Sequence, residues 1–121
     1  MNAVNWFEIP VNDMDRAKKF YENVLGIEIA ITEMGPSVMG WFPGTPEDQG
    51  ATGSLIKGDG YVPSHTGSLI YMHVGDIEGT LGKIGSHGGS TLLPKTNIGE
   101  HGFIAHFEDC EGNKVALHSR T

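Results

Sequence analysis

Residues 5–26 read NWFEIPVNDMDRAKKFYENVLG, and this stretch decides the fold because it contains a strand, a helix and the signals that separate them. Residues 5–11 alternate between an apolar side and a mixed side, and this period of two predicts a strand with one buried face. Asn12 or Asp13 then supplies a helix N-cap. Apolar residues recur at helical spacing up to Gly26, which predicts a helix that ends at this glycine.

The second half of the chain repeats these signals in the same order. Residues 69–74, LIYMHV, predict a strand, and Asp76 is expected to cap a second helix that ends at Gly88 and Gly89. One offset of 63 residues separates three landmarks of the two halves, Val11 and Val74, Asp13 and Asp76, and Gly26 and Gly89. A constant offset at three structural landmarks indicates an internal duplication.

Short apolar runs between glycine-rich turns predict the remaining strands. They lie at 27–31, 38–42 and 53–56 in the first half, and at 90–93, 103–107 and 114–118 in the second. We expect an α+β fold in a single domain, 1–121, with repeat 1 at about 1–60 and repeat 2 at about 66–121. Two tandem βαβββ modules would form a curved mixed eight-stranded sheet around a cleft, with the helices outside.

Composition argues against several classes of partner. The net charge is −7, whereas nucleic acids and anionic membranes attract clustered Lys and Arg. No apolar run approaches the ~18–20 residues of a membrane span. The one cysteine, Cys110, cannot form an internal disulfide, which fits a cytoplasmic protein. We therefore expect neither nucleic acid nor a membrane as the main partner.

Two segments resemble a known family. IPVNDMDRAKKFYENVLG (9–26) and FEDCEGNKVALHS (107–119) are similar to the opening and the closing hairpin of a vicinal-oxygen-chelate module, the superfamily of glyoxalases, bleomycin resistance proteins and dioxygenases. The whole chain resembles the branch related to lactoylglutathione lyase through GSLI, YVPS, LLPKTNIGEHGFIA and LHS. Cys110 stands where the closing turn usually has proline. The resemblance implies the fold described above, a ligand-binding cleft and a homodimer.

Metal-dependent members of this superfamily hold a divalent ion with His, Gln or Glu from both modules. By register, three of these positions fall on Trp6, Leu69 and Ala116, and the fourth falls within 53–56, where Ser54 alone has a side-chain oxygen. None of these residues is an ordinary ligand for a divalent metal. We therefore expect no metal at the usual positions and no cofactor, although a divalent ion at a shifted position remains an alternative.

The strand faces opposite the helices carry the candidate site residues. Alternation places Glu8 on this face of the first strand. It places Tyr71 and His73, and then His106 and His118, on the corresponding face of the second-half strands. We therefore expect these side chains to meet in one cleft. Trp6, Trp41 and Leu69 would form its walls. A buried carboxylate beside histidines would suit acid–base chemistry, whereas a purely structural alternative has Glu8 accept a hydrogen bond from Tyr71 or a histidine.

Three functions remain open at this point. The first is a bleomycin-resistance-like protein that binds or sequesters a small organic molecule without chemistry. The alternative is a lyase or isomerase related to lactoylglutathione lyase, with Glu8 as base and His118 or His73 as its partner, with or without a non-standard divalent metal. The third is a structural or regulatory domain without a small ligand. No residue pattern identifies the ligand itself.

Overall fold

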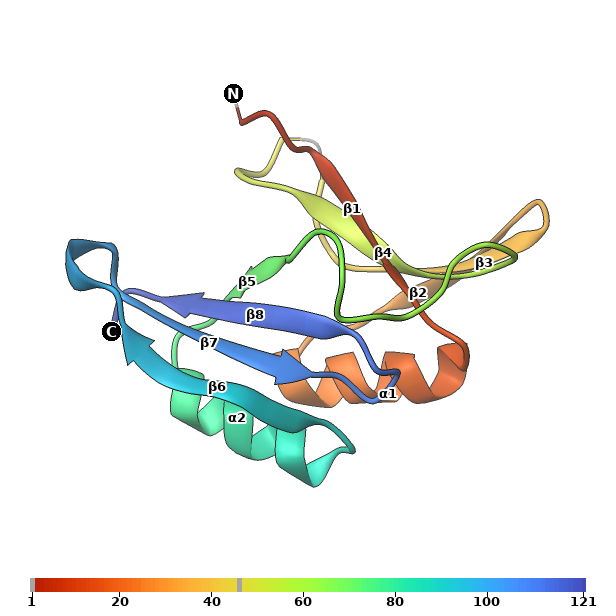
Figure 1. Cartoon of the computed structure of the whole chain (residues 1–121). Helices are drawn as coiled ribbons and strands as arrows, with labels where there is room; N and C mark the ends of the chain where they lie inside the picture. The colour runs from red at the N-terminus through yellow and green to blue at the C-terminus, as the bar shows by residue number, and fades with distance from the viewer. Residues whose placement is uncertain (1, 46) are drawn as a thin grey trace.

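The computed structural model describes residues 2–45 and 47–121, and it consists of two four-stranded mixed sheets with one helix on each (Figure 1). The first half contains β1 (Trp6–Pro10), α1 (Met14–Leu25), β2 (Ala30–Met34), β3 (Ser37–Trp41) and β4 (Thr52–Lys57). The second contains β5 (Tyr71–His73), α2 (Ile77–Ser86), β6 (Ser90–Asn97), η1 (Gly99–His101), β7 (Phe103–Glu108) and β8 (Lys114–Ser119). The predicted α+β class and the tandem βαβββ modules are confirmed.

The two sheets have the same strand order. It is β1-β4-β3-β2 in the first and β5-β8-β7-β6 in the second. In each sheet the strand before the helix runs parallel to the last strand of its half, and the other pairs are antiparallel. The eight strands are hydrogen-bonded as two separate sheets of four, rather than as the continuous eight-stranded sheet of the sequence prediction.

The N-caps of the two helices form the same hydrogen bond. Asp13 Oδ1 accepts a hydrogen bond from the Arg16 amide at 3.1 Å, and Asp76 Oδ1 accepts one from the Gly79 amide at 3.1 Å. Both cap residues have extended backbones. Gly26 ends α1 in the left-handed region, with φ of 67°, where a side chain would be strained.

Some predicted boundaries shift. The strand expected at 27–31 begins at Ala30, because Ile29 is buried against the core and its amide donates to Glu22 Oε2 at 2.9 Å. Helix α2 ends at Ser86, before Gly88. Gly89 instead allows a close approach, since a Cβ there would lie 2.5 Å from the Glu108 carbonyl oxygen.

The two halves share one hydrophobic core. The inward face of β1, the apolar side of α1 and the inward faces of β7 and β8 contribute to the same buried cluster. Phe20 and Tyr21 on α1 are buried, and the Phe20 ring lies 6.4 Å from that of Phe107 on β7. Helix α1 also contacts α2, so it packs against both halves (Figure 1). No helix in the described parts of the chain is long and apolar enough to cross a bilayer.

Buried polar side chains of the β7–β8 turn form hydrogen bonds with the first half of the chain, and we call this network the junction. Asp109, 2% exposed, accepts hydrogen bonds from the Tyr21 hydroxyl at 2.7 Å and from the Glu111 and Asn113 amides. Asn113 Nδ2 donates to the Pro10 carbonyl at 2.7 Å. This network explains why a polar turn, EDCEGN, is buried.

In this junction, burial, neighbouring charges and hydrogen bonds shift the pKa values of three side chains. Burial, followed by the Asp109 carboxylate, raises the pKa of Tyr21 well above its usual value. Burial alone would raise the pKa of Glu111, but hydrogen bonds from Arg16 and from two backbone amides lower it. Burial and the two adjacent carboxylates raise the pKa of the Cys110 thiol to about 12, so it is protonated and a poor nucleophile near neutral pH.

Candidate functional site

The outer face of the first sheet, the face away from α1, carries a tryptophan pair. Trp6 on β1 and Trp41 on β3 lie with ring centroids 5.3 Å apart at 70°, an edge-to-face arrangement. The register places both rings on one face: Trp6 pairs with Thr52 on β4, and Trp41 pairs from the other side with Ser54, two residues further along β4. Trp41 is 41% exposed, so much of its ring is available to a ligand.

A pocket of about 710 Å³ lies beside this pair. Its apolar walls include both indoles, Val4 and Phe42, and its polar groups come from Asn5, Asp48, Gln49 and Thr52. The loop between β3 and β4 forms one side, where Asp48 Oδ2 accepts a hydrogen bond from the Thr45 amide at 2.8 Å. All of its lining residues belong to the first half of the chain. Apolar walls with a few polar groups are typical of small-molecule sites.

Ser54 occupies the middle of the same face. Its side chain is 0% exposed, and its hydroxyl has no hydrogen-bond partner among the described residues. A buried hydroxyl without a partner is uncommon and raises the free energy of the folded state. The backbone of Ser54 lies in β4 between Glu8 on β1 and Trp41 on β3.

The outer face of the second sheet, away from α2, brings four of the predicted residues together in two pairs. The Tyr71 hydroxyl and His106 Nε2 lie 3.4 Å apart, with ring centroids at 6.1 Å. The rings of His73 and His118 lie 6.4 Å apart on the parallel strands β5 and β8. His118 Nε2 donates to the His101 carbonyl at 2.7 Å, which places a proton on this nitrogen. Partial burial, followed by the Lys114 ammonium, lowers the pKa of His106.

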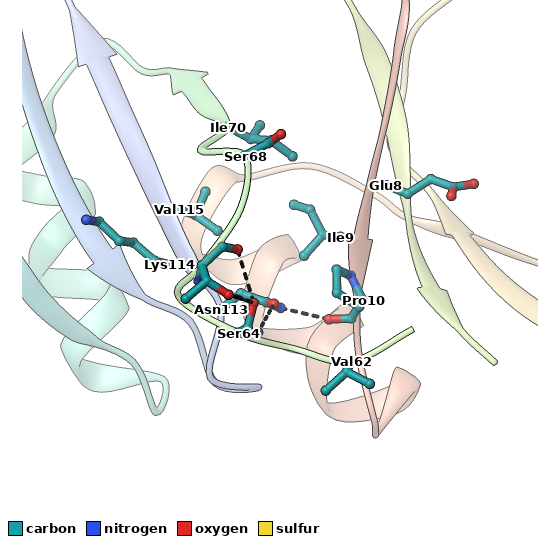
Figure 2. A pocket seen from close by; sticks show the side chains of 11 residues that line it. Glu8, Ile9, Pro10, Val62, Ser64, Ser68, Ile70, Asn113, Lys114 and Val115 are labelled. Atoms are coloured by element: carbon teal, nitrogen blue, oxygen red, sulfur yellow. Dashed lines mark hydrogen bonds between the residues drawn. The ribbon is translucent and has the colours of Figure 1, made fainter. Parts of the chain in front are cut away.

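The two outer faces point in different directions within one chain. Figure 2 shows the Glu8 side chain on the side of β1 away from β8, and the Lys114 side chain extending from β8 in the opposite direction. Lys114, Ala116 and His118 alternate with core residues on β8, so the histidines share the face of Lys114. The single chain therefore does not bring Glu8 to Tyr71 or the histidines, and the one shared cleft of the sequence hypothesis is not formed. Side-chain alternation identified the faces, but not the angle between the sheets.

A smaller groove of about 260 Å³ separates the sheets between β1 and β8 (Figure 2). Ile9 and Val115 line it from the two sheets, and the segment before β5 crosses it. Asn113 Oδ1 accepts a hydrogen bond from the Ser64 amide at 3.2 Å, which fixes this segment against β8. The groove thus belongs to the contact between the halves, while Glu8 lies at its rim and is exposed.

The positions that the resemblance assigns to metal ligands are distributed over both faces. Trp6 and Ser54 lie on the first sheet, Ala116 on β8, and half-buried Leu69 two residues before β5. An indole, two aliphatic groups and one buried hydroxyl do not fit a divalent ion. Among residues 2–45 and 47–121, no group of three or more His, Cys, Asp or Glu side chains is arranged to hold a metal.

Two sequence comparisons both match the chain to glyoxalase-like proteins. The model of the Glyoxalase/Bleomycin resistance protein/Dioxygenase superfamily matches residues 3–117. A curated relative, a glyoxylase-like domain-containing protein from Didymella fabae, is 28% identical over 126 residues, covering 97% of this chain and 93% of the relative.

Solved structures resemble the chain in fold. Glyoxalase I from Zea mays has a TM-score of 0.70 at 20% identity, covering 95% of this chain and 45% of the maize chain, so the present chain spans less than half of that enzyme. TnmS3, an antibiotic binding protein from Streptomyces sp., has a TM-score of 0.69 at 20% identity, covering 100% of this chain and 98% of its own.

Proposed function

The chain belongs to the Glyoxalase/Bleomycin resistance protein/Dioxygenase superfamily, and we propose that it binds a small organic molecule with a planar apolar part in the pocket beside Trp6 and Trp41. The observation that carries this proposal is the tryptophan pair itself. Two indoles at the edge of a pocket of about 710 Å³ provide a large apolar contact area, and Asn5, Asp48, Gln49 and Thr52 can orient a ligand by hydrogen bonding.

Binding without the usual metal is part of the proposal. The indole, the hydroxyl and the aliphatic groups at the four ligand positions leave no conventional site for the ion that polarises a substrate in metal-dependent members. A full-length structural relative, TnmS3, is described as an antibiotic binding protein, which supports a binding role for this fold.

Intrinsic fluorescence tests the proposal directly, because both tryptophans of the chain belong to the pair. We expect an antibiotic with a planar aromatic part, such as bleomycin, to quench the emission in a saturable manner. Trp41→Ala should weaken binding by about tenfold, the equivalent of ~1.4 kcal/mol of lost contact. Tyr61→Ala removes a comparably exposed ring, 38% exposed, that does not line this pocket, and serves as the matched control. Turnover of a ligand, or loss of affinity in Tyr61→Ala alone, would contradict simple binding at the tryptophan pair.

We further propose a homodimer. Trp41 and Tyr71 are 41% and 47% exposed on faces that point apart, so each chain presents two partial surfaces. A second copy could place its second sheet opposite the first sheet of its partner and so enclose the ligand. Light scattering should give twice the chain mass of 13.0 kDa, and a monomer at all concentrations would contradict this arrangement.

The acid–base alternative, with Glu8 and His118, depends on the same assembly. Within one chain these groups lie on faces that point apart, so a reaction that uses both requires residues from two copies. Mixing Glu8→Gln and His118→Gln proteins would then restore activity in part of the dimers. A pair of inactive variants that stays inactive when mixed would remove this alternative.

A further inference from the structure

The outer face of the second sheet contains a cluster of hydrogen-bond donors around one small residue. Ala116, in the middle of β8, pairs in register with Tyr71 on β5 and with His106 on β7. Lys114 and His118 stand two residues before and after it, so their side chains lie on the same face. Four polar side chains therefore surround a methyl group, and we call Tyr71, His106, Lys114 and His118 the donor cluster.

The donor cluster is rich in positive charge or in groups that can acquire it. Lys114 is a cation, His106 and His118 gain charge on protonation, and the Tyr71 hydroxyl is neutral. The Lys114 ammonium lies near enough to His106 to help lower its pKa, after partial burial. The cluster therefore carries one fixed positive charge, that of Lys114, and gains another when His106 is protonated.

The neighbouring carboxylates are occupied elsewhere. Glu108 is the cross-strand partner of Lys114, but its Oε2 lies 2.7 Å from His65 Nε2. Asp109 and Glu111 are buried in the junction and bonded there. Within the described parts of the chain, Lys114 forms no ion pair. Among the described residues, the Lys114 ammonium is therefore an unpaired cation beside half-buried His106 and exposed Tyr71.

We infer that the donor cluster binds an oxyanion, the carboxylate or phosphate group of a ligand. Lys114 supplies the fixed charge, protonated His106 a charge-assisted hydrogen bond, and Tyr71 a neutral donor that can turn from His106 to the anion. Ala116 also favours the binding of an anion, because its methyl group adds no charge. A carboxylate at this position would neutralise the cluster. This inference goes beyond the proposed pocket and does not depend on the tryptophan pair.

The site predicts a pH-dependent affinity. Anion binding strengthens as the pH falls through the pKa of His106, because the protonated ring attracts the anion and the anion stabilises the added proton. The titratable or charged groups on the strands and segments around His106 are Tyr71, His73, Lys95, Glu108, Lys114, His118 and His65. Of these, Lys114 is the charge that shifts the pKa of His106.

Imidazole NMR of the full chain tests the inference with sodium phosphate and sodium acetate as probes, against sodium chloride at equal ionic strength. We expect phosphate to raise the pKa of His106 by about one unit, as an opposite charge within ~4–6 Å does. A shift of the His106 pKa with acetate but not with phosphate identifies a carboxylate ligand. A shift with phosphate identifies a phosphate ligand. Equal shifts in chloride would overturn the inference.

Variants sharpen the experiment. Lys114→Gln should abolish the phosphate-dependent shift, and Lys18→Gln, which removes a lysine paired with Glu22 on α1, should retain it. Retention of the shift in Lys114→Gln would overturn the proposed site. Trp41→Ala should also retain it, so failure of the tryptophan pocket and failure of the donor cluster are separate results.

Discussion

The two halves of the chain repeat their inner layers and differ on their outer faces. Asp13 and Asp76 cap their helices with the same hydrogen bond, whereas Trp6 and Glu8 correspond at the offset of 63 residues to Leu69 and Tyr71. Caps and core positions are constrained by burial and by backbone hydrogen bonding. Exposed positions on the outer faces carry no such constraint, and there one face is aromatic and the other is rich in histidine.

The largest predicted effect concerns the junction, where the two halves meet. Asp109→Ala should lower the free energy of unfolding by ~3–5 kcal/mol, because it leaves the Tyr21 hydroxyl and two amides buried without an acceptor. Urea denaturation followed by circular dichroism measures this loss. Glu8→Ala, which removes an exposed carboxylate from an outer face, should change stability by less than ~0.5 kcal/mol. Equal losses in the two variants would contradict the distinction.

The repeated caps should respond equally. Asp13→Ala and Asp76→Ala should each lower the free energy of unfolding by ~1 kcal/mol, because each removes the acceptor for one amide of the first helical turn. The same denaturation measurement applies. A loss confined to one variant would show that the two caps are not energetically equivalent.

The tryptophan pair should couple within its own face. A double-mutant cycle with Trp6→Ala and Trp41→Ala should give an interaction energy of ~0.5–1.5 kcal/mol, the range for edge-to-face aromatic pairs. The corresponding cycle with Trp6→Ala and Tyr71→Ala should be additive at concentrations where the chain is monomeric, since these rings lie on different sheets. Coupling between Trp6 and Tyr71 in the monomer would mean that the two faces do meet.

The smallest effect is a pH dependence on the second face. The pKa of His106 is lowered by partial burial and then by Lys114, so the unfolded chain binds more protons than the folded one below the ordinary value of 6.5. Stability is therefore lost as the pH falls from that value toward the folded pKa. His106→Gln should reduce this dependence between about pH 5 and 7, as measured by urea denaturation at each pH. An unchanged slope would contradict the role of His106.

The same sequence signals that predicted the fold also identified the members of each face. Alternation in β1 and β8 separated Ile9 and Val115, which are buried, from Glu8 and His118. The junction was missed, because Asp109 and Asn113 occupy a polar turn that reads as exposed, and their partners Tyr21 and Pro10 are distant in the chain.

By itself, the sequence determined the duplication, both helices with their N-caps, and the core-facing side of β1, β7 and β8, because these follow from local hydrogen bonding and from a period of two or 3.6 residues. Only the tertiary structure decided that Trp6 meets Trp41, that Tyr71 meets His106, and that Glu8 points away from the face that carries the histidines. The angle between two sheets depends on long-range packing, here of Phe20 against Phe107 and of Asp109 against Tyr21, and no local pattern encodes that angle.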